Sequence, residues 1–139
     1  MINEKDVFIR AVLYIEKNLF NENLTVLDVA NEVKINESLL SEIFLRQDIG
    51  VTPKEYICRR RAQEAEKEII RLYRAGKNIK GSDVAKKCGY SSFNHMTNSL
   101  YIVTGMRFKI FKDKVIANYN AGNPPIVQND FMKKLDFLM

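Results

Sequence analysis

The feature that most constrains this chain is an internal repeat with a spacing of 55 residues. The matching positions share residue type or apolar character: Asp28-Val29-Ala30 with Asp83-Val84-Ala85, Ile35 with Tyr90, Gly50 with Gly105, and Tyr56 with Phe111. Between these matches the register slips by one residue, so that Leu40 and Phe44 correspond to Met96 and Leu100. Self-similarity at a fixed spacing indicates a repeated supersecondary unit. The chain is therefore expected to contain two copies of one unit.

The residues of the repeat have the periodicity and the start signals of helices. Apolar residues between Asp6 and Leu19 recur close to a 3.6-residue period, which is typical of an amphipathic helix. Thr25 followed by Asp28 predicts the start of a short second helix, and Asn36 predicts the cap of a third. Each copy is thus expected to contain a short helix, a tight turn and a second helix of about ten residues.

One long helix is predicted between the two copies. The run Thr52-Pro53-Lys54-Glu55 combines an N-cap, a proline at the first helical position and the glutamate of a capping box. No glycine or proline follows before Gly76, so we expect about 21 helical residues, roughly 30 Å at 1.5 Å per residue.

The predicted fold is all-α with about seven helices, and its parts follow one another along the chain. The expected order is a first helix-turn-helix subdomain at residues 1–51, a linker helix at 52–75, a second helix-turn-helix subdomain at 76–116 and a C-terminal tail at 117–139. Within the tail, residues 118–125 are rich in helix breakers, and residues 129–139 have the pattern of a short amphipathic helix.

Charge is distributed unevenly along the chain, whose formal net charge is +5. Residues 1–50 carry five Lys or Arg against nine Asp or Glu, whereas residues 51–116 carry fifteen against six. A basic segment of this kind favours a polyanionic partner such as the phosphates of double-stranded DNA. The acidic first fifty residues do not share this preference.

Several other classes of function lack the residues that they need. No apolar run approaches the roughly 18–20 residues of a membrane span, and no signal-peptide pattern is present, so we expect no membrane partner and a cytoplasmic location. Cys58, Cys88 and His95 do not have the spacing of metal ligands. No nucleophile–base pair, carboxylate dyad or glycine-rich phosphate loop is recognisable. We therefore expect no enzyme activity, no cofactor and no metal.

The arrangement predicted for each copy is that of a helix-turn-helix, whose second helix enters the major groove of DNA. Three-helix units also occur in proteins that never touch DNA, but a second copy and a basic connecting helix favour DNA binding. A helix of roughly 30 Å would separate the copies by close to one turn of B-DNA, about 34 Å. One chain could then reach two successive major grooves, so a monomer is expected.

Several segments resemble one family of regulators. Residues 24–30 are similar to "L-S-L-E-D-L-A", residues 36–44 to "S-x-x-Y-L-S-R-L-F", and residues 50–61 to "G-x-S-P-x-x-Y-L-x-x-R-R". In the second copy, residues 83–92 resemble "I-A-x-x-x-G-F-x-D", and residues 105–111 stand where "G-x-S-P-x-x-Y-R" would be. These motifs resemble the AraC/XylS family of transcription regulators. The resemblance implies a bacterial regulator similar to the short, standalone activators of stress response and multidrug resistance.

The sequence departs from the family pattern in both recognition helices. Glu42 stands where the family usually has Arg, and Leu45 stands at or near a usual Lys position. In the second copy, Asn98 replaces the usual Arg and Tyr101 the usual Lys. A carboxylate repels phosphate and can at best accept from the amino group of cytosine. We therefore expect the second copy to be the better reader of bases.

Two sets of residues are predicted to contact DNA. The candidate base readers are uncharged polar side chains on the expected outer faces: Asn36, Ser38, Ser41, Ser91, Ser92, Asn94, Thr97 and Asn98. The candidate phosphate contacts are cations in or beside these helices: Lys54, Arg59, Arg60, Lys86, Lys87, Arg107, Lys109 and Lys112. Each polar side chain alone is equally typical of a solvated surface, and each cation alone is more often a solvated surface charge. His95, on the second recognition helix, could touch a base edge but is interpreted as a partly packed histidine.

A second function of a different class stays open. The same fold could serve as a protein-binding module or anti-regulator whose acidic first copy is the contact surface, formed by Glu37, Glu42, Leu45 and Asp48. An exposed Leu45 beside these carboxylates would favour this alternative, whereas a buried Leu45 would remove one of its supports. In the DNA-binding interpretation, the same copy contacts the DNA weakly or faces another protein, such as RNA polymerase or another regulator.

Overall fold

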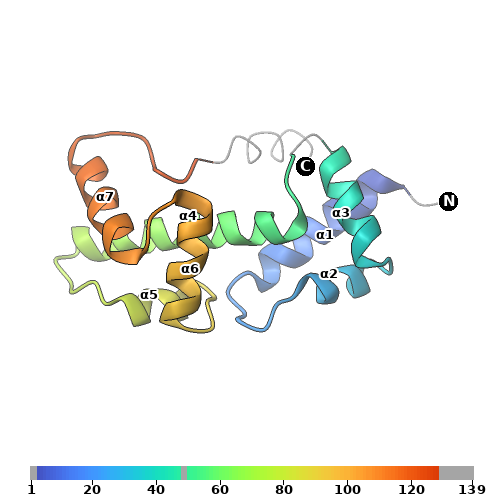
Figure 1. Cartoon of the computed structure of the whole chain (residues 1–139), viewed down its shortest axis with the longest axis horizontal. Helices are drawn as coiled ribbons and strands as arrows, with labels where there is room; N and C mark the ends of the chain where they lie inside the picture. Colours follow the sequence, from blue (N-terminus) through green and yellow to red (C-terminus); the bar gives the residue numbers. More distant parts are fainter. Residues whose placement is uncertain (1–2, 48–49, 129–139) are drawn as a thin grey trace. The chain divides into compact units, whose positions relative to one another are not determined.

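The computed structural model describes residues 3–47 and 50–128, and within these ranges every regular element is an α-helix (Figure 1). The helices are α1 (Glu4–Asn18), α2 (Val26–Glu32), α3 (Glu37–Arg46), α4 (Pro53–Arg74), α5 (Gly81–Lys87), α6 (Phe93–Thr104) and α7 (Phe108–Asn120). The predicted all-α fold is therefore confirmed.

Side-chain caps fix where the first helices begin. Thr25 and Asp28 form a complete capping box, in which the Asp28 amide donates to Thr25 Oγ1 at 3.1 Å and the Thr25 amide donates to Asp28 Oδ2 at 3.0 Å. Asn36 caps α3, because its Oδ1 accepts from the amide of Leu39 at 2.8 Å. Both caps satisfy amides that a helix start leaves without an intrahelical partner. These predicted helix starts are confirmed.

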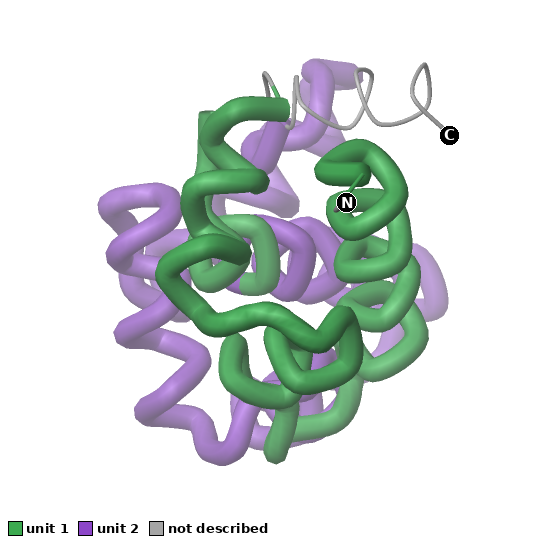
Figure 2. Tube along the Cα trace, turned by 90° about the vertical axis from the view of Figure 1, so that its right-hand side faces the viewer, with its two compact units in different colours: residues 1–57, 129–139 green, residues 58–128 purple. Residues whose placement is uncertain are grey.

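The helix α4 is one continuous element of 22 residues that begins after Thr52, whose Oγ1 accepts from the amide of Glu55 at 3.2 Å. The chain divides into two compact units, and the boundary between them falls within α4 (Figure 2). Of the described residues, 3–47 and 50–57 form unit 1, and 58–128 form unit 2. Of the described elements, α1, α2, α3 and the first turn of α4 belong to unit 1, and the rest belong to unit 2.

The core of unit 1 is centred on three aromatic rings that make edge-to-face contacts. The ring centroids of Phe8 and Phe44 are 4.9 Å apart, and those of Phe44 and Tyr56 are 6.3 Å apart. All three side chains are fully buried, as is Leu40 beside them. The Tyr56 hydroxyl donates to Glu16 Oε2 at 2.8 Å, so its one polar atom is satisfied. Aromatic pairs in these orientations stabilise a core beyond the area that they bury.

The core of unit 2 uses the equivalent positions of the repeat. Met96 and Leu100 on α6 and Phe111 on α7 are fully buried, like Leu40, Phe44 and Tyr56 in unit 1. The register slip has a simple cause, since the α2–α3 connection is residues 33–36 and the α5–α6 connection is residues 88–92, one residue longer. Gly50 and Gly105 both have positive φ, +68° and +76°. The matched glycines therefore occupy the same left-handed conformation, which disfavours other residues.

The segment after α7 returns to α4 within unit 2. The helix α7 ends at Asn120, inside the stretch expected to be a breaker-rich linker. Further on, the amides of Ile126 and Val127 donate to the two carboxylate oxygens of Glu66 at 2.8 Å and 2.9 Å. Glu66 is 3% exposed, so a buried carboxylate holds this segment against α4. Residues 129–139, where a short amphipathic helix is predicted, lie outside the described residues.

Candidate nucleic-acid interface

The helix α6 has the two faces that a recognition helix requires. Met96 and Leu100 face the core of unit 2. Asn94, Asn98 and Tyr101 are exposed and follow at the i, i+4 and i+7 spacing, which places them in one row on the outer face. The helix contains no Asp, Glu, Lys or Arg. Its outer face therefore offers amide and aromatic groups without fixed charge of its own.

Two of the predicted base readers on α6 hold the local structure together. The Oγ of Ser92 accepts from the amide of His95 at 3.0 Å and caps the helix. The Oγ1 of Thr97 accepts from the amide of Phe108 at 2.9 Å, which links α6 to the first turn of α7. Both side chains have structural partners in the free protein. Asn94 is exposed at the start of the same helix.

His95 lies against Tyr90, with the ring centroids 5.5 Å apart in an edge-to-face orientation. Its Nδ1 accepts from the amide of Ser91 at 3.1 Å and is 3.1 Å from the Ser91 Oγ. A ring nitrogen that accepts from an amide carries no proton, so the neutral form has its proton on Nε2. Burial, and secondarily the charge of Arg61, lower the pKa of His95 below the usual value. The histidine is thus exposed on one side, packs against Tyr90 on another and is oriented by Ser91.

A cluster on the outer side of α6 joins this helix to the residue before α7. The Arg107 guanidinium carbon lies 4.9 Å from the centroid of the Tyr101 ring, a cation–π distance. One of its nitrogens donates to Asn98 Oδ1 at 2.8 Å. Sequence reasoning placed Arg107 among the phosphate contacts and gave no sign of this cluster, because its members come from two elements.

The predicted phosphate contacts of unit 2 occupy different environments. Lys86 on α5 and Lys109 on α7 are exposed, and Lys112 is half-buried. Lys87 is exposed but pairs with Glu68 at 3.0 Å. Arg60 is 8% exposed and donates to Gln63 at 2.9 Å. Of these cations, Lys86 and Lys109 are therefore the most accessible to a phosphate.

Much of the positive charge of α4 is balanced within unit 2. Glu64 accepts from Lys67 at 3.0 Å and lies 3.5 Å from Arg60. Glu68, almost fully buried, pairs with Arg71 as well as with Lys87. These cations, with Arg71 first, lower the pKa of the Glu68 carboxyl. Fewer cations of α4 are therefore available to a phosphate than the net charge of the sequence suggests.

The helix α3 of unit 1 presents a different surface. Asn36 is exposed but already caps the helix, Ser38 is exposed and Ser41 is half-buried. Glu37 is exposed in the first turn, and Lys54 is exposed at the start of α4. These side chains are reachable from solvent, but none of them is a cation on α3.

The acidic candidate surface of α3 includes an exposed apolar side chain. Leu45 is 51% exposed. Beside it in sequence, Arg46 pairs with Glu4 at 2.6 Å and with Glu42 at 3.6 Å, so the one cation of α3 is neutralised by two carboxylates. Asp48, the fourth residue of the predicted protein contact, lies outside the described residues.

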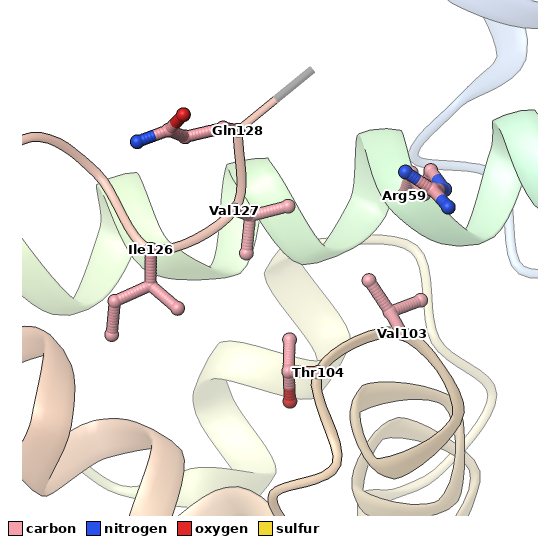
Figure 3. Close-up of a pocket in the computed structure, with 6 residues that line it drawn as sticks. All are labelled: Arg59, Val103, Thr104, Ile126, Val127 and Gln128. Carbon is pink, nitrogen blue, oxygen red and sulfur yellow. The ribbon is translucent and has the colours of Figure 1, made fainter. Parts of the chain in front are cut away.

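A small pocket of unit 2, with a volume of about 230 Å³, is bordered by residues of α4, α6 and the segment after α7 (Figure 3). Its lining residues are Arg59, Val103, Thr104, Ile126, Val127 and Gln128. The volume is below the range of about 300–1,000 Å³ that is typical of small-molecule sites. Arg59, a predicted phosphate contact, is half-buried at this border.

Residues 3–47 and 50–128 lack the features of two other kinds of site. This part of the chain contains no group of three or more His, Cys, Asp or Glu that could hold a metal ion. It also contains no helix with the length and apolar character needed to cross a membrane. Cys58 and Cys88 are free cysteines, and burial raises the pKa of the Cys88 thiol to about 12. A thiol held in this form is a poor nucleophile.

The sequence pattern of a family described as a helix-turn-helix domain matches residues 29–114, which run from α2 into α7 and make up more than half of the chain. No curated protein and no solved structure matches significantly.

Proposed function

Because the chain belongs to the AraC-type helix-turn-helix family, we propose that it is a sequence-specific transcription regulator that reads double-stranded DNA mainly through unit 2. The observation that carries this proposal is the outer face of α6, where exposed amide side chains stand in a row without an acidic residue. Asn side chains read base edges in the major groove, with adenine as the favoured partner. The helix that enters the groove is then α6.

Charge favours unit 2 as the part that binds phosphate. Residues 58–128 contain fourteen Lys or Arg against five Asp or Glu. Lys86 on α5 and Lys109 and Lys112 on α7 come from the elements that adjoin α6 and are not among the cations paired above. Contacts of this kind give affinity and orientation without sequence information. Arg59 is a further candidate, whereas Lys87 and Arg60 would have to leave their present partners.

The protein is proposed to act as a monomer, with unit 1 as the weaker contributor. A helix-turn-helix dimer binds two half-sites related by symmetry, whereas one chain with two unlike units binds a site without a palindrome. The Glu37 and Glu42 carboxylates of α3 oppose close contact with phosphate. Unit 1 therefore adds little to affinity, through Asn36, Ser38, Ser41 and Lys54 at most.

Selection from a pool of random duplex DNA, followed by binding of the winners across a salt series, tests this function. The expected result is one enriched motif without a palindrome, bound by one chain per duplex. The logarithm of the affinity should fall steeply and linearly with the logarithm of the salt concentration. Binding without an enriched motif, or no binding, would contradict a sequence-specific regulator.

A second candidate function rests on the exposure of Leu45. An apolar side chain that is 51% exposed beside Glu42 fits a contact surface for another protein, such as RNA polymerase or a second regulator. The test is affinity capture from a nuclease-treated extract by the wild-type chain and by Leu45→Ala, with Leu27→Ala, an equally exposed leucine on α2, as the control. A discrete partner lost only with Leu45→Ala would favour this function, and equal capture by all three chains would contradict it.

A further inference from the structure

We infer that Arg107 is a base-reading side chain of unit 2 that recognises a guanine, positioned on the outer face of α6 by Tyr101 and Asn98. This inference rests on the proposed function and names a base that the site would select. The residue precedes α7 in sequence, yet its guanidinium lies beside the recognition helix.

Two contacts hold the guanidinium over α6. Its carbon lies 4.9 Å from the centroid of the Tyr101 ring, and a nitrogen donates to Asn98 Oδ1 at 2.8 Å. Asn98 and Tyr101 belong to the exposed row of α6, one turn apart. A cation held by this row is presented on the face that enters the groove, whereas a side chain that only met phosphate would not need these partners.

The chemistry of guanidinium fits a guanine. Its five N–H donors lie in a rigid planar fork, and one hydrogen bond to Asn98 leaves the others free to donate. Guanine presents two acceptors, O6 and N7, in the major groove, and arginine donates to both in the commonest specific contact. The ring of Tyr101 restricts the guanidinium before binding, which lowers the entropy lost when the fork meets its base.

The same contact changes what Asn98 is expected to do. To recognise adenine, Asn accepts from N6 and donates to N7. In the structure its Oδ1 already accepts from Arg107. With its Oδ1 held by Arg107, Asn98 is assigned the role of a positioning residue, and the base expected opposite this part of α6 is a guanine instead of an adenine.

The arginine can be replaced without removing a structural contact of α7. Arg107 is the N-cap residue of α7, but its side chain makes no capping hydrogen bond, and the Phe108 amide is satisfied by Thr97. Arg107→Ala should therefore still fold, with only a small fall in melting temperature from the loss of its contacts with Asn98 and Tyr101. Lys109→Ala, which removes an exposed cation two residues away, is the matched control.

The test repeats the duplex selection with the wild type, Arg107→Ala and Lys109→Ala. Arg107→Ala should lose a guanine at one position of the motif and bind the wild-type site about 5- to 150-fold more weakly, the range for one bidentate base contact. Lys109→Ala should keep every position and weaken all sequences alike. Replacing that guanine with 7-deazaguanine, which lacks N7, should weaken the wild type and leave Arg107→Ala unaffected.

The outcomes separate this inference from the proposed function. A motif that keeps every guanine in Arg107→Ala, with a salt slope reduced by about one, would show a phosphate contact and overturn the inference alone. A wild type that enriches no motif would overturn both. Tyr101→Leu and Asn98→Ala should each weaken the preference for the same guanine, and a preference unchanged in both would contradict the positioning assigned to them.

Discussion

The exposed side of α3 in unit 1 carries Glu37, Glu42 and Leu45. The corresponding helix of unit 2 is α6, which exposes Asn94 and Asn98 and has no Asp, Glu, Lys or Arg. The buried positions of the two helices nevertheless correspond along the repeat. The repeat therefore determines the interior of each unit, and the outer faces of α3 and α6 are free to differ. The proposed division of function between the units follows from those faces.

The largest effect should come from truncating one core side chain on the buried face of α3 and one on that of α6. Leu40→Ala and Met96→Ala remove corresponding, fully buried side chains of α3 and α6. Each should lower the free energy of unfolding by about 2–5 kcal/mol, because a cavity adds to the lost burial. Urea denaturation followed by circular dichroism measures this loss.

The same pair also tests which unit reads DNA. At temperatures where both variants remain folded, Met96→Ala should lose more affinity for the selected motif than Leu40→Ala. Equal losses of affinity at equal stability would contradict the proposal that unit 2 contributes more than unit 1 to DNA binding.

A smaller effect is expected from reversing one exposed charge in each unit. Lys86→Glu on α5 should weaken binding to all duplexes several-fold and reduce the salt slope by about 0.9 or more, because one phosphate contact is lost. Lys17→Glu on α1 reverses an exposed cation of unit 1 and should change neither quantity appreciably. Fluorescence anisotropy across a salt series checks both. An equal response to the two substitutions would mean that unit 1 also lies against the DNA backbone.

Two single substitutions at the start of α6 distinguish a capping side chain from a base-reading one. Ser92→Ala should lower the free energy of unfolding by about 0.5–2 kcal/mol, because the capping hydrogen bond to the His95 amide is lost. Asn94→Ala, at an exposed position, should change stability by less than about 0.5 kcal/mol but alter the selected motif. Thermal melts and duplex selection separate the two. A motif left intact by Asn94→Ala would remove this residue from the reading face.

The smallest effect is a dependence on pH that belongs to unit 2. His95 is the one histidine of the chain, and its burial lowers its pKa relative to the unfolded chain. The unfolded state therefore binds a proton at a higher pH than the folded state, and stability falls as the pH drops through the ordinary histidine range near 6.5. His95→Gln should flatten the change in urea midpoint between pH 7.5 and 5.5. If His95→Gln shows a change in urea midpoint as large as that of the wild type, groups other than His95 cause the pH dependence.

Much of the fold follows from local signals in the sequence. The caps at Thr25 and Asn36, the long helix after Pro53 and the paired glycines of the repeat are local features, and the structure has each of them. The one-residue slip of the repeat also has its counterpart, in a longer turn before α6. Such features depend on residues within a few positions of one another, which is where sequence patterns are informative.

The contacts that shape the candidate site could not be predicted in the same way. Arg107 meets Asn98 and Tyr101 across the turn between α6 and α7, and Glu66 binds the amides of a segment sixty residues further along the chain. Nor could the sequence show that Ser92 and Thr97 are already engaged by backbone amides. These pairings depend on where side chains point after packing, and residue type and spacing do not determine that direction.

The most direct test of the proposal that unit 2 reads the bases is duplex selection with matched variants of α3 and α6. One variant carries Ser38→Ala, Ser41→Ala and Glu42→Ala in α3, and the other carries Asn94→Ala and Asn98→Ala in α6. The α3 variant should enrich the wild-type motif, and the α6 variant should lose or change it. An α3 variant that changes the motif, beside an α6 variant that keeps it, would contradict the assignment of base reading to unit 2.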